Sequence, residues 1–272
     1  MPTITTIDSK ALGLSAYLRK IWSFRSMLLL FSKRDLQVKY AQTFLGIGWA
    51  LLQPLTGLII FTLFFGKLIK IDTGGVPYPL FAFTGMVSWF LFSQILVGAG
   101  LALQEGQNLI KRIYFPKMTL LLSKVLVSTL EFLVSLTLLI LLMLALGRFP
   151  SARILYLPLF VLFNVASGLS IAIWLSALTI RHRDFHHIIP YLVNFGIWLT
   201  PVFYPATLIP RTYQWVLYLN PMAATIAGFR WCLAGMPPPD PGYLLSLIPV
   251  FLLLGSGLNY FRKVESSIAD YI

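Results

Sequence analysis

The sequence predicts an all-α polytopic membrane protein with six spans, and three observations support this. Of its 272 residues, 58% are hydrophobic and only 11% are charged, whereas about 25% charged residues is usual in soluble proteins. The mean hydropathy is +0.81. The apolar residues fall into runs of about 20, the length of a helix that crosses a bilayer, and a chain of this size holds about six such runs with short loops.

An amphipathic stretch, residues 14–31, precedes the first span. At 100° per residue one arc is apolar, and the opposite arc carries polar side chains: Arg19, Lys20, Ser23 and Ser26. Arg25 falls on the apolar arc, where a long side chain can snorkel. We expect a helix lying in the membrane surface, within an N-terminal segment of residues 1–43. The alternative is an incomplete span, and the charges weigh against it. No cleavable signal peptide is apparent.

Six apolar runs form one transmembrane domain, residues 44–263, which is followed by a tail at 264–272. The predicted spans are 44–66, 80–103, 119–146, 154–180, 187–204 and 243–261. Between the last two, the apolar pieces Tyr213–Leu219 and Ala223–Leu233 are too short to cross. We expect two short re-entrant or surface helices there, because irregular backbone at membrane depth must be buried in protein or line a wet cavity.

Lysine and arginine orient these spans. Six spans put both termini on one side, and 15 of the 21 Lys and Arg residues then fall on that side. The positive-inside rule therefore predicts cytoplasmic termini and an outward-facing segment 205–242. The net charge of +12 does not require nucleic acid, because the basic residues flank apolar runs, where they set orientation and contact anionic lipid.

Motifs for catalysis are missing from the sequence. It has no G-x-x-x-x-G-K-[ST] loop for ATP and no H-E-x-x-H. Glu131 is the one carboxylate deep in a predicted span, which makes it a functional candidate; a neutral carboxyl, or a local pair with Lys124, is the plainer alternative. His182 and His186 lack a third ligand, so we expect no metal site. Cys232 is the single cysteine, which excludes an internal disulfide.

Two groups of residues are candidates for function. Aromatic stripes at helical spacing would suit a conduit lined for sugars, although plain packing explains them as well: Phe81, Trp89, Phe92, Tyr191, Phe195 and Trp198. The loop Glu105–Met118 has helix-like apolar spacing, which would let it dock in a groove of a soluble partner. A solvated loop is the alternative there.

Four segments resemble, in order, the membrane subunits of ATP-binding-cassette (ABC) polysaccharide exporters. They are KRDLQVKYAQTFLGIGWALLQP (33–54), LIKRIYFPKM (109–118), RHRDFHHIIPYLVNFGIWLTPVFYP (181–205) and YLNPMAATIAGFRWCLAG (218–235). Such proteins move O-antigen, capsule or teichoic-acid chains, and the resemblance is greatest to the O-antigen (lipopolysaccharide) export permeases. Together the segments cover the chain nearly end to end.

The resemblance implies a homodimer in the bacterial inner membrane, bound to two copies of a separate P-loop ATPase. The ATPase would hold ATP and Mg, and this chain would hold no cofactor. The substrate would be a polysaccharide on undecaprenyl diphosphate, and the channel along the dimer axis would be lined partly by aromatics. Coupling to the ATPase would involve Asn108, Lys111, Arg112, Tyr114, Phe115 and Pro116. We expect diphosphate contacts at Arg34, Arg181 and Arg183.

Two other functions stay open on the sequence. A small-molecule or antibiotic efflux permease belongs to the same superfamily, but such proteins often carry a large outer domain or a fused ATPase, and neither is evident. A polyprenyl-phosphate glycosyl- or phosphotransferase usually needs clustered Asp or Glu at the membrane face. The nine acidic residues of this chain are scattered.

Overall fold

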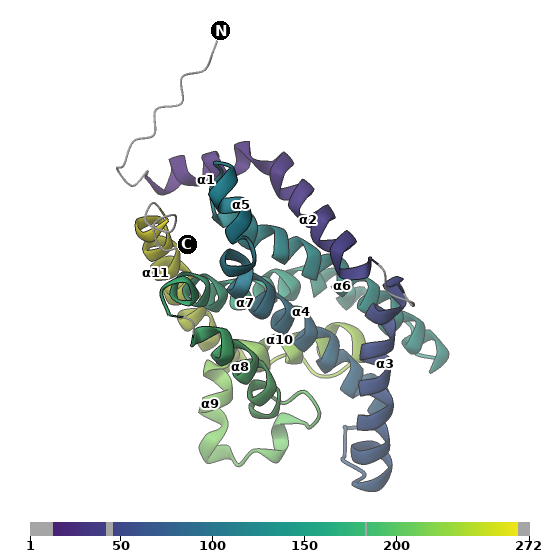
Figure 1. Ribbon diagram of the computed structural model, residues 1–272. Coiled ribbons are helices and arrows are strands. Elements are labelled where there is room, and N and C mark those ends of the chain that lie inside the picture. Colours follow the sequence, from purple (N-terminus) through teal and green to yellow (C-terminus); the bar gives the residue numbers. More distant parts are fainter. Residues whose placement is uncertain (1–12, 42–45, 183, 266–272) are drawn as a thin grey trace.

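The computed structural model describes residues 13–41, 46–182 and 184–265. Every regular element in these ranges is a helix, and no strand occurs in them, which confirms the predicted all-α class (Figure 1). The elements are α1 Leu14–Ser23, α2 Arg25–Tyr40, η1 Gly46–Gly48, α3 Trp49–Phe61, η2 Thr62–Leu68, α4 Tyr78–Glu105, α5 Gln107–Arg112, α6 Met118–Ala145, η3 Ala152–Tyr156, α7 Leu157–Arg181, α8 Phe185–Leu199, η4 Ala206–Leu208, η5 Arg211–Tyr213, α9 Gln214–Leu219, α10 Pro221–Phe229, η6 Arg230–Ala234, η7 Pro241–Ser246 and α11 Leu247–Val264.

Helix α4 is the centre of the bundle, and α6 and α7 pack against it. In its apolar window 78% of the residues are buried, against at most 39% in the other long apolar helices of the described chain. Small residues allow this packing. A Cβ at Gly98 would lie 3.3 Å from Lys124 Cβ of α6, and one at Gly168 of α7 would lie 3.0 Å from Ile95 Cγ2 of α4. Small residues at such positions let helices approach closely inside a membrane.

Within the described ranges, five helical segments are long and apolar enough to cross a bilayer: Leu51–Leu68, Tyr78–Glu105, Met118–Ala145, Ala152–Ile180 and Pro241–Val264. They coincide with the first four and the last of the predicted spans. The predicted fifth span, 187–204, contains α8, which has only 15 residues. At 1.5 Å per residue α8 covers about 22 Å, less than the ~30 Å of a hydrocarbon core. The sixth crossing therefore stays a prediction.

The N-terminal stretch departs from the prediction of a single helix over residues 14–31. The chain bends at Phe24 (φ −94°, ψ 16°), and α2 continues to Tyr40. In α1 the side chains of Tyr17 and Ile21, one turn apart, are buried against the bundle. Exposed apolar side chains remain beside them: Leu14, Leu18, Trp22, Leu29 and Leu30. Such a surface suits contact with lipid, although the position of α1 relative to a membrane stays a prediction.

Two short helices, α9 and α10, are present between α8 and the last span, and they meet at Asn220 as predicted. Asn220 Oδ1 accepts a hydrogen bond from the N–H of Met222 at 2.9 Å, which caps α10. Its Nδ2 donates to Thr200 Oγ1 at 3.1 Å, so the same side chain holds the segment after α8. Helix α9 lies at the end of the bundle opposite the termini (Figure 1), whereas α10 is buried against α4 and α7.

The two ends of the described chain lie together at one end of the bundle (Figure 1). The carboxylate of Glu265 accepts a hydrogen bond from the backbone N–H of Lys117, just before α6, at 2.5 Å. The guanidinium of Arg262 lies over the ring of Tyr17, 5.9 Å from its centroid. Five crossings alone would place the two ends of a chain on opposite sides of a membrane.

The packing of α4 against the segment after α8 gives a stability prediction. A Cβ at Gly85 would lie 2.7 Å from the carbonyl oxygen of Val202, so we expect Gly85→Ala to destabilise by about 1–3 kcal/mol through overpacking. The measurement is the thermal unfolding midpoint in detergent. Gly255→Ala is the control, because its Cβ would meet nothing within 4 Å, and Ala favours helix. Equal midpoints for the two variants would contradict the close packing.

Candidate functional site

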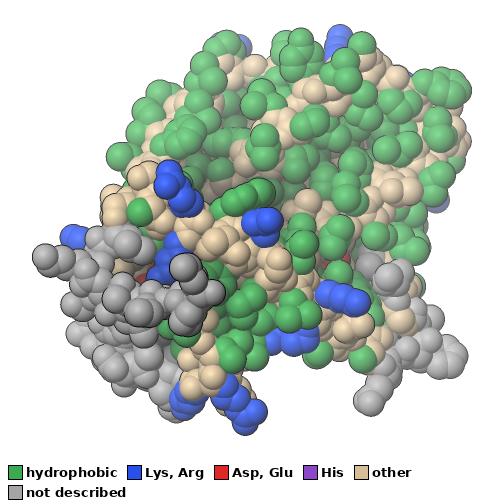
Figure 2. Space-filling view, turned by 90° about the horizontal axis from the view of Figure 1, so that it is seen from above, with side chains coloured by type: hydrophobic (Ala, Val, Ile, Leu, Met, Phe, Trp, Pro, Cys, Tyr) green, Lys and Arg blue, Asp and Glu red, His purple; other side chains and the backbone are tan. Residues whose placement is uncertain are grey.

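Helices α1, α2 and α5, the loop 113–117 and the last turn of α11 meet at the end of the bundle that holds both termini of the described chain. We call this the basic end. Figure 2 looks onto it and shows lysine and arginine side chains at several places among many hydrophobic ones, with few acidic ones. Most of the residues that the sequence assigned to coupling and to diphosphate binding belong to this end.

In helix α5 and the loop after it, some side chains are buried against the bundle and others are exposed. Ile110 and Phe115 are buried, and the Phe115 ring packs edge-on against the ring of Phe31 of α2, with centroids 5.2 Å apart. Pro116 is also buried. Four of the six predicted coupling residues project to the exterior: Asn108, Lys111, Arg112 and Tyr114. The loop thus presents a short, positively charged helix and an exposed tyrosine on a fixed base.

Tyr114 is held in place by two cations. Lys20 Nζ of α1 donates a hydrogen bond to the Tyr114 hydroxyl at 2.7 Å. Lys20 and Lys117 also lie 5.1 and 5.4 Å from the centroid of the ring, positions at which a cation is attracted to the ring face. Helix α1 therefore supports the exposed tip of the loop, and a displacement of either one changes the other.

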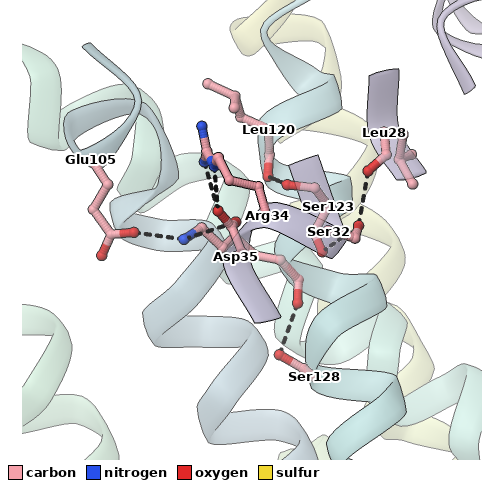
Figure 3. A network of polar contacts seen from close by, with 9 residues as sticks. Leu28, Ser32, Arg34, Asp35, Glu105, Leu120, Ser123 and Ser128 are labelled. Carbon is pink, nitrogen blue, oxygen red and sulfur yellow. Dashed lines mark hydrogen bonds and ion pairs between the residues drawn. The ribbon is translucent and has the colours of Figure 1, made fainter. Parts of the chain in front are cut away.

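A network of alternating charges connects α2, α4 and α6 beside the loop (Figure 3). Arg34 Nη2 lies 2.6 Å from Asp35 Oδ1. Lys124 Nζ lies 3.2 Å from Asp35 Oδ2 and 2.7 Å from Glu105 Oε2. These four side chains line a cavity of about 600 Å³. Two cations and two carboxylates balance there, so the predicted diphosphate contact Arg34 is already neutralised by Asp35.

The other two predicted diphosphate contacts follow α7. Arg181 is the last residue of that helix, and the position of its side chain is not described. Arg183 lies outside the described residues. Diphosphate binding at these two positions therefore stays a prediction.

Glu131 pairs with α2 and not with Lys124, which corrects the local pair considered from the sequence. Its side chain is 7% exposed, and Oε1 lies 2.6 Å from Lys39 Nζ. The Tyr40 hydroxyl donates to the same oxygen at 2.8 Å. Burial, together with the bond to Glu131, raises the pKa of Tyr40, so the phenol stays protonated and donates. Lys124 is held elsewhere, by Asp35 and Glu105.

The predicted channel residues divide into two sets. Phe81, Trp89 and Phe92 of α4 are at most 6% exposed in this chain. Tyr191, Phe195 and Trp198 of α8 are at least 53% exposed. The rings of Tyr191 and Phe195 are nearly parallel, with centroids 5.8 Å apart and an angle of 2°. We call the three residues of α8 the aromatic stripe. Whether either set lines a channel stays a prediction.

Arg230 is the residue that sequence reasoning missed, because it was counted only among the outward charges. It is 5% exposed, and its guanidinium lies 3.5 Å from the centroid of Phe81. A guanidinium stays protonated in proteins, so Arg230 places a positive charge inside the protein. A lone arginine within the apolar segment Pro221–Gly235 was the available signal, since ionisable residues in such segments are seldom incidental.

The described histidines give no cluster for a metal ion. His186 Nδ1 lies 3.2 Å from Gln104 Oε1, and the ring of His187 packs edge-on against that of His186. Within the described ranges, no three His, Cys, Asp or Glu residues come close enough to share an ion.

Residues 27–234 match the family described as ABC-2 type transporter, which is more than half of the chain. The chain belongs to this family. As an ABC-2 type transporter with five long apolar helices, it is a multi-pass membrane protein and a transporter component.

Several curated ABC-2 type relatives are similar over nearly their whole length. An O-antigen export system permease protein of Myxococcus xanthus is 27% identical over 93% of this chain and 98% of its own. A protein of the same name from Klebsiella pneumoniae is 25% identical over 90% and 95%. A polysialic acid transport protein of Escherichia coli is 22% identical over 86% and 92%.

The pair between Lys39 and Glu131 gives a second stability prediction. Removal of one partner of a buried pair costs about 3–5 kcal/mol, and the exposure of Lys39, 51%, reduces that cost. We expect Lys39→Met to lower the thermal midpoint more than Glu131→Gln, because the amide still bonds to Lys39 and Tyr40. The double variant should recover most of the loss.

Lys33→Met is the matched control, because Lys33 is an exposed lysine of the same helix. Surface substitutions of this kind usually change stability by about 0.5 kcal/mol or less. A Lys39→Met midpoint equal to that of the control would show that the pair does not fix α2 to α6.

Proposed function

We propose that this protein is the membrane subunit of an ABC transporter that exports polysaccharide across the bacterial inner membrane. The substrate is an O-antigen type chain linked to undecaprenyl diphosphate. The observation that supports this best is the similarity to the Myxococcus xanthus O-antigen export permease, which covers 98% of that protein. Similarity to a polysialic acid transport protein points to the same class of cargo. A separate P-loop ATPase, present in two copies, binds ATP and Mg and drives the transport.

The proposed topology has six crossings with both termini in the cytoplasm. The meeting of the two chain ends requires an even number of crossings, and α8, together with the segment after it, is the candidate for the sixth. A span shorter than the bilayer is tolerated through local thinning of the membrane, at modest cost. The basic end then faces the cytoplasm, as the positive-inside rule requires. Helices α9 and α10 re-enter from the outer side.

The proposed channel forms between two copies of the chain. Tyr191 and Phe195 of the aromatic stripe are more than 60% exposed in the described single chain, whereas Trp198 also packs against Phe61 and Phe203. A second copy related by two-fold symmetry would present the same stripe. The ring of Trp89 of α4 packs closely against the backbone of α8 at Gly196, where an added Cβ would lie 2.9 Å from Cη2 of Trp89. We therefore assign polymer contact to the stripe. Support of α8 is assigned to the buried set Phe81, Trp89 and Phe92.

The exposed residues of α5 and its loop are proposed to contact the ATPase. They include two cations, Lys111 and Arg112, and the ring of Tyr114, and Phe115 and Pro116 fix the loop to the bundle. A movement of the loop is transmitted to α1 through the hydrogen bond between Lys20 and Tyr114. It is transmitted to the end of α11 through the hydrogen bond between Lys117 and Glu265. The network at Arg34 lies next to this loop. A diphosphate would bind Arg34 by replacing Asp35, with Arg181 and Arg183 as further contacts.

Surface polysaccharide tests both the proposed function and the coupling loop. In a host that lacks its own permease and carries the partner ATPase, the wild-type protein should restore surface polymer. Tyr114→Ala should reduce export strongly at unchanged protein level, because the exposed tip is lost. Phe115→Ala should instead lower the protein level, since a cavity in the core costs about 3–5 kcal/mol. Full export by Tyr114→Ala would contradict the coupling role, and no export by the wild type would contradict the proposed function.

The aromatic stripe predicts a defect in transport with normal folding. Simultaneous replacement of Tyr191, Phe195 and Trp198 by Ala should slow the appearance of surface polymer, because stacking contacts along the path disappear. The thermal midpoint should stay close to wild type, since these rings are largely exposed. Phe251→Ala is the control, because Phe251 of α11 is similarly exposed at 63%. Equal export by the two variants would favour lipid contact for the stripe.

A further inference from the structure

A cavity beside Arg230 takes no part in the functions assigned so far. It has a volume of about 390 Å³ and lies among α4, α9, η6 and η7, near the end of the bundle opposite the basic end. Its polar lining consists of Thr207, Gln214, Tyr218, Arg230, Asp240 and Tyr243. The volume falls within the range of about 300–1,000 Å³ that is usual for small-molecule sites.

Arg230 brings to this cavity a positive charge that has no carboxylate partner. Its Nη2 donates to the carbonyl oxygen of Val202 at 2.7 Å, and its Nε donates to that of Phe81 at 3.4 Å. None of the ion pairs among the described residues includes it. No described acceptor bonds to Nη1, and Arg230 lines the cavity. Burial of an unpaired charge costs several kcal/mol, and a bound anion would offset that cost.

Asp240 does not supply this anion. It is exposed at the rim of the cavity, and its Oδ1 accepts a hydrogen bond from the N–H of Gly242 at 2.7 Å. Water screens an exposed carboxylate, so the buried guanidinium dominates the electrostatic potential at the floor of the cavity. The charges are therefore ordered by depth, with the cation at the floor and the carboxylate at the rim.

The walls of the cavity suit a hydroxylated ring. Tyr218 and Tyr243 pack edge to face, with centroids 5.4 Å apart and an angle of 86°, and both line the cavity. Gln214 adds an amide that can bond to hydroxyl groups. An acidic sugar combines the features that this lining recognises: a carboxylate for the floor, a ring for the tyrosines and hydroxyls for the amide.

We infer that the cavity is a binding site for an acidic sugar, which places its carboxylate on Arg230 and its hydroxyls toward Gln214. The sugar is a unit of the exported chain, and this part of the inference rests on the proposed function. The site is distinct from the aromatic stripe, because none of the three stripe residues lines the cavity. It would hold a charged unit of the polymer at the outer side.

The first test is ligand binding to the full-length protein in lipid nanodiscs, measured by thermophoresis. Sodium glucuronate should bind, and glucose should bind at least about tenfold more weakly, because one charge-assisted hydrogen bond is worth 1.4 kcal/mol or more. Inorganic phosphate should also bind more weakly than glucuronate, since it lacks the ring. Equal affinity for glucose would overturn the role of Arg230, and equal affinity for phosphate would overturn the recognition of a sugar.

Variants then identify the cavity as the site. Arg230→Gln should raise the Kd for glucuronate at least about tenfold, whereas Arg211→Gln, an exposed arginine of the same outer segment, should leave it unchanged. Asp240→Asn should tighten glucuronate binding by roughly two- to fivefold, because one exposed like charge is removed. The amide oxygen can still accept from Gly242, so the fold is kept.

The glucuronate affinity of Asp240→Asn tests the inference even if Arg230→Gln fails to fold. Unchanged or weaker glucuronate binding by Asp240→Asn would overturn the inference. These measurements use the permease alone, so they are independent of export. Export with no glucuronate binding would overturn only this site, and glucuronate binding without export would overturn only the proposed function.

Discussion

Close packing around α4 is the constraint on which the other features depend. A helix buried on all sides needs neighbours that fit its small residues, and α6, α7 and the segment after α8 each do so. This packing places Trp89 behind α8, so the opposite face of α8 turns outward with its aromatic rings. It also fixes the carbonyl of Phe81 and the ring beneath Arg230. The aromatic stripe and the cavity beside Arg230 are thus both positioned by one central helix.

Ion pairs join helix α2 to α6, and α6 to α4. Asp35 and Lys39 of α2 bind Lys124 and Glu131 of α6, so two ion pairs one turn apart fix α2 along α6. Lys124 reaches further, to Glu105 at the end of α4, and connects this pair of helices to the loop that carries Tyr114. The excess of positive charge in the composition therefore does not amount to a ready anion site at Arg34. Among the described residues, the buried cation without an ion pair is Arg230, in the cavity between α4 and α9.

The apolar runs predicted five spans well, because length and hydropathy are local properties of the sequence. At α8 the run continues to residue 204, whereas the helix ends at Leu199 and Thr200 is extended, so hydropathy did not give the end of this helix. Composition alone also did not separate Phe81, which is buried, from Phe195, which is exposed, since both lie in apolar helices at similar spacing. The bend at Phe24 has no glycine or proline to signal it. The partner of Glu131 comes from 92 positions away, beyond the reach of pattern analysis.

The bond between Lys117 and Glu265 has a consequence for biosynthesis. Helix α6 has no capping side chain of its own at its first turn, and the carboxylate that accepts the N–H there belongs to the last residue of the described chain. An acidic group at this position also complements the helix dipole. The ribosome makes α6 long before Glu265, so this cap forms only after the final span has been synthesised. Completion of the basic end is therefore a late step of assembly, and nascent chains that stop short of it lack that contact.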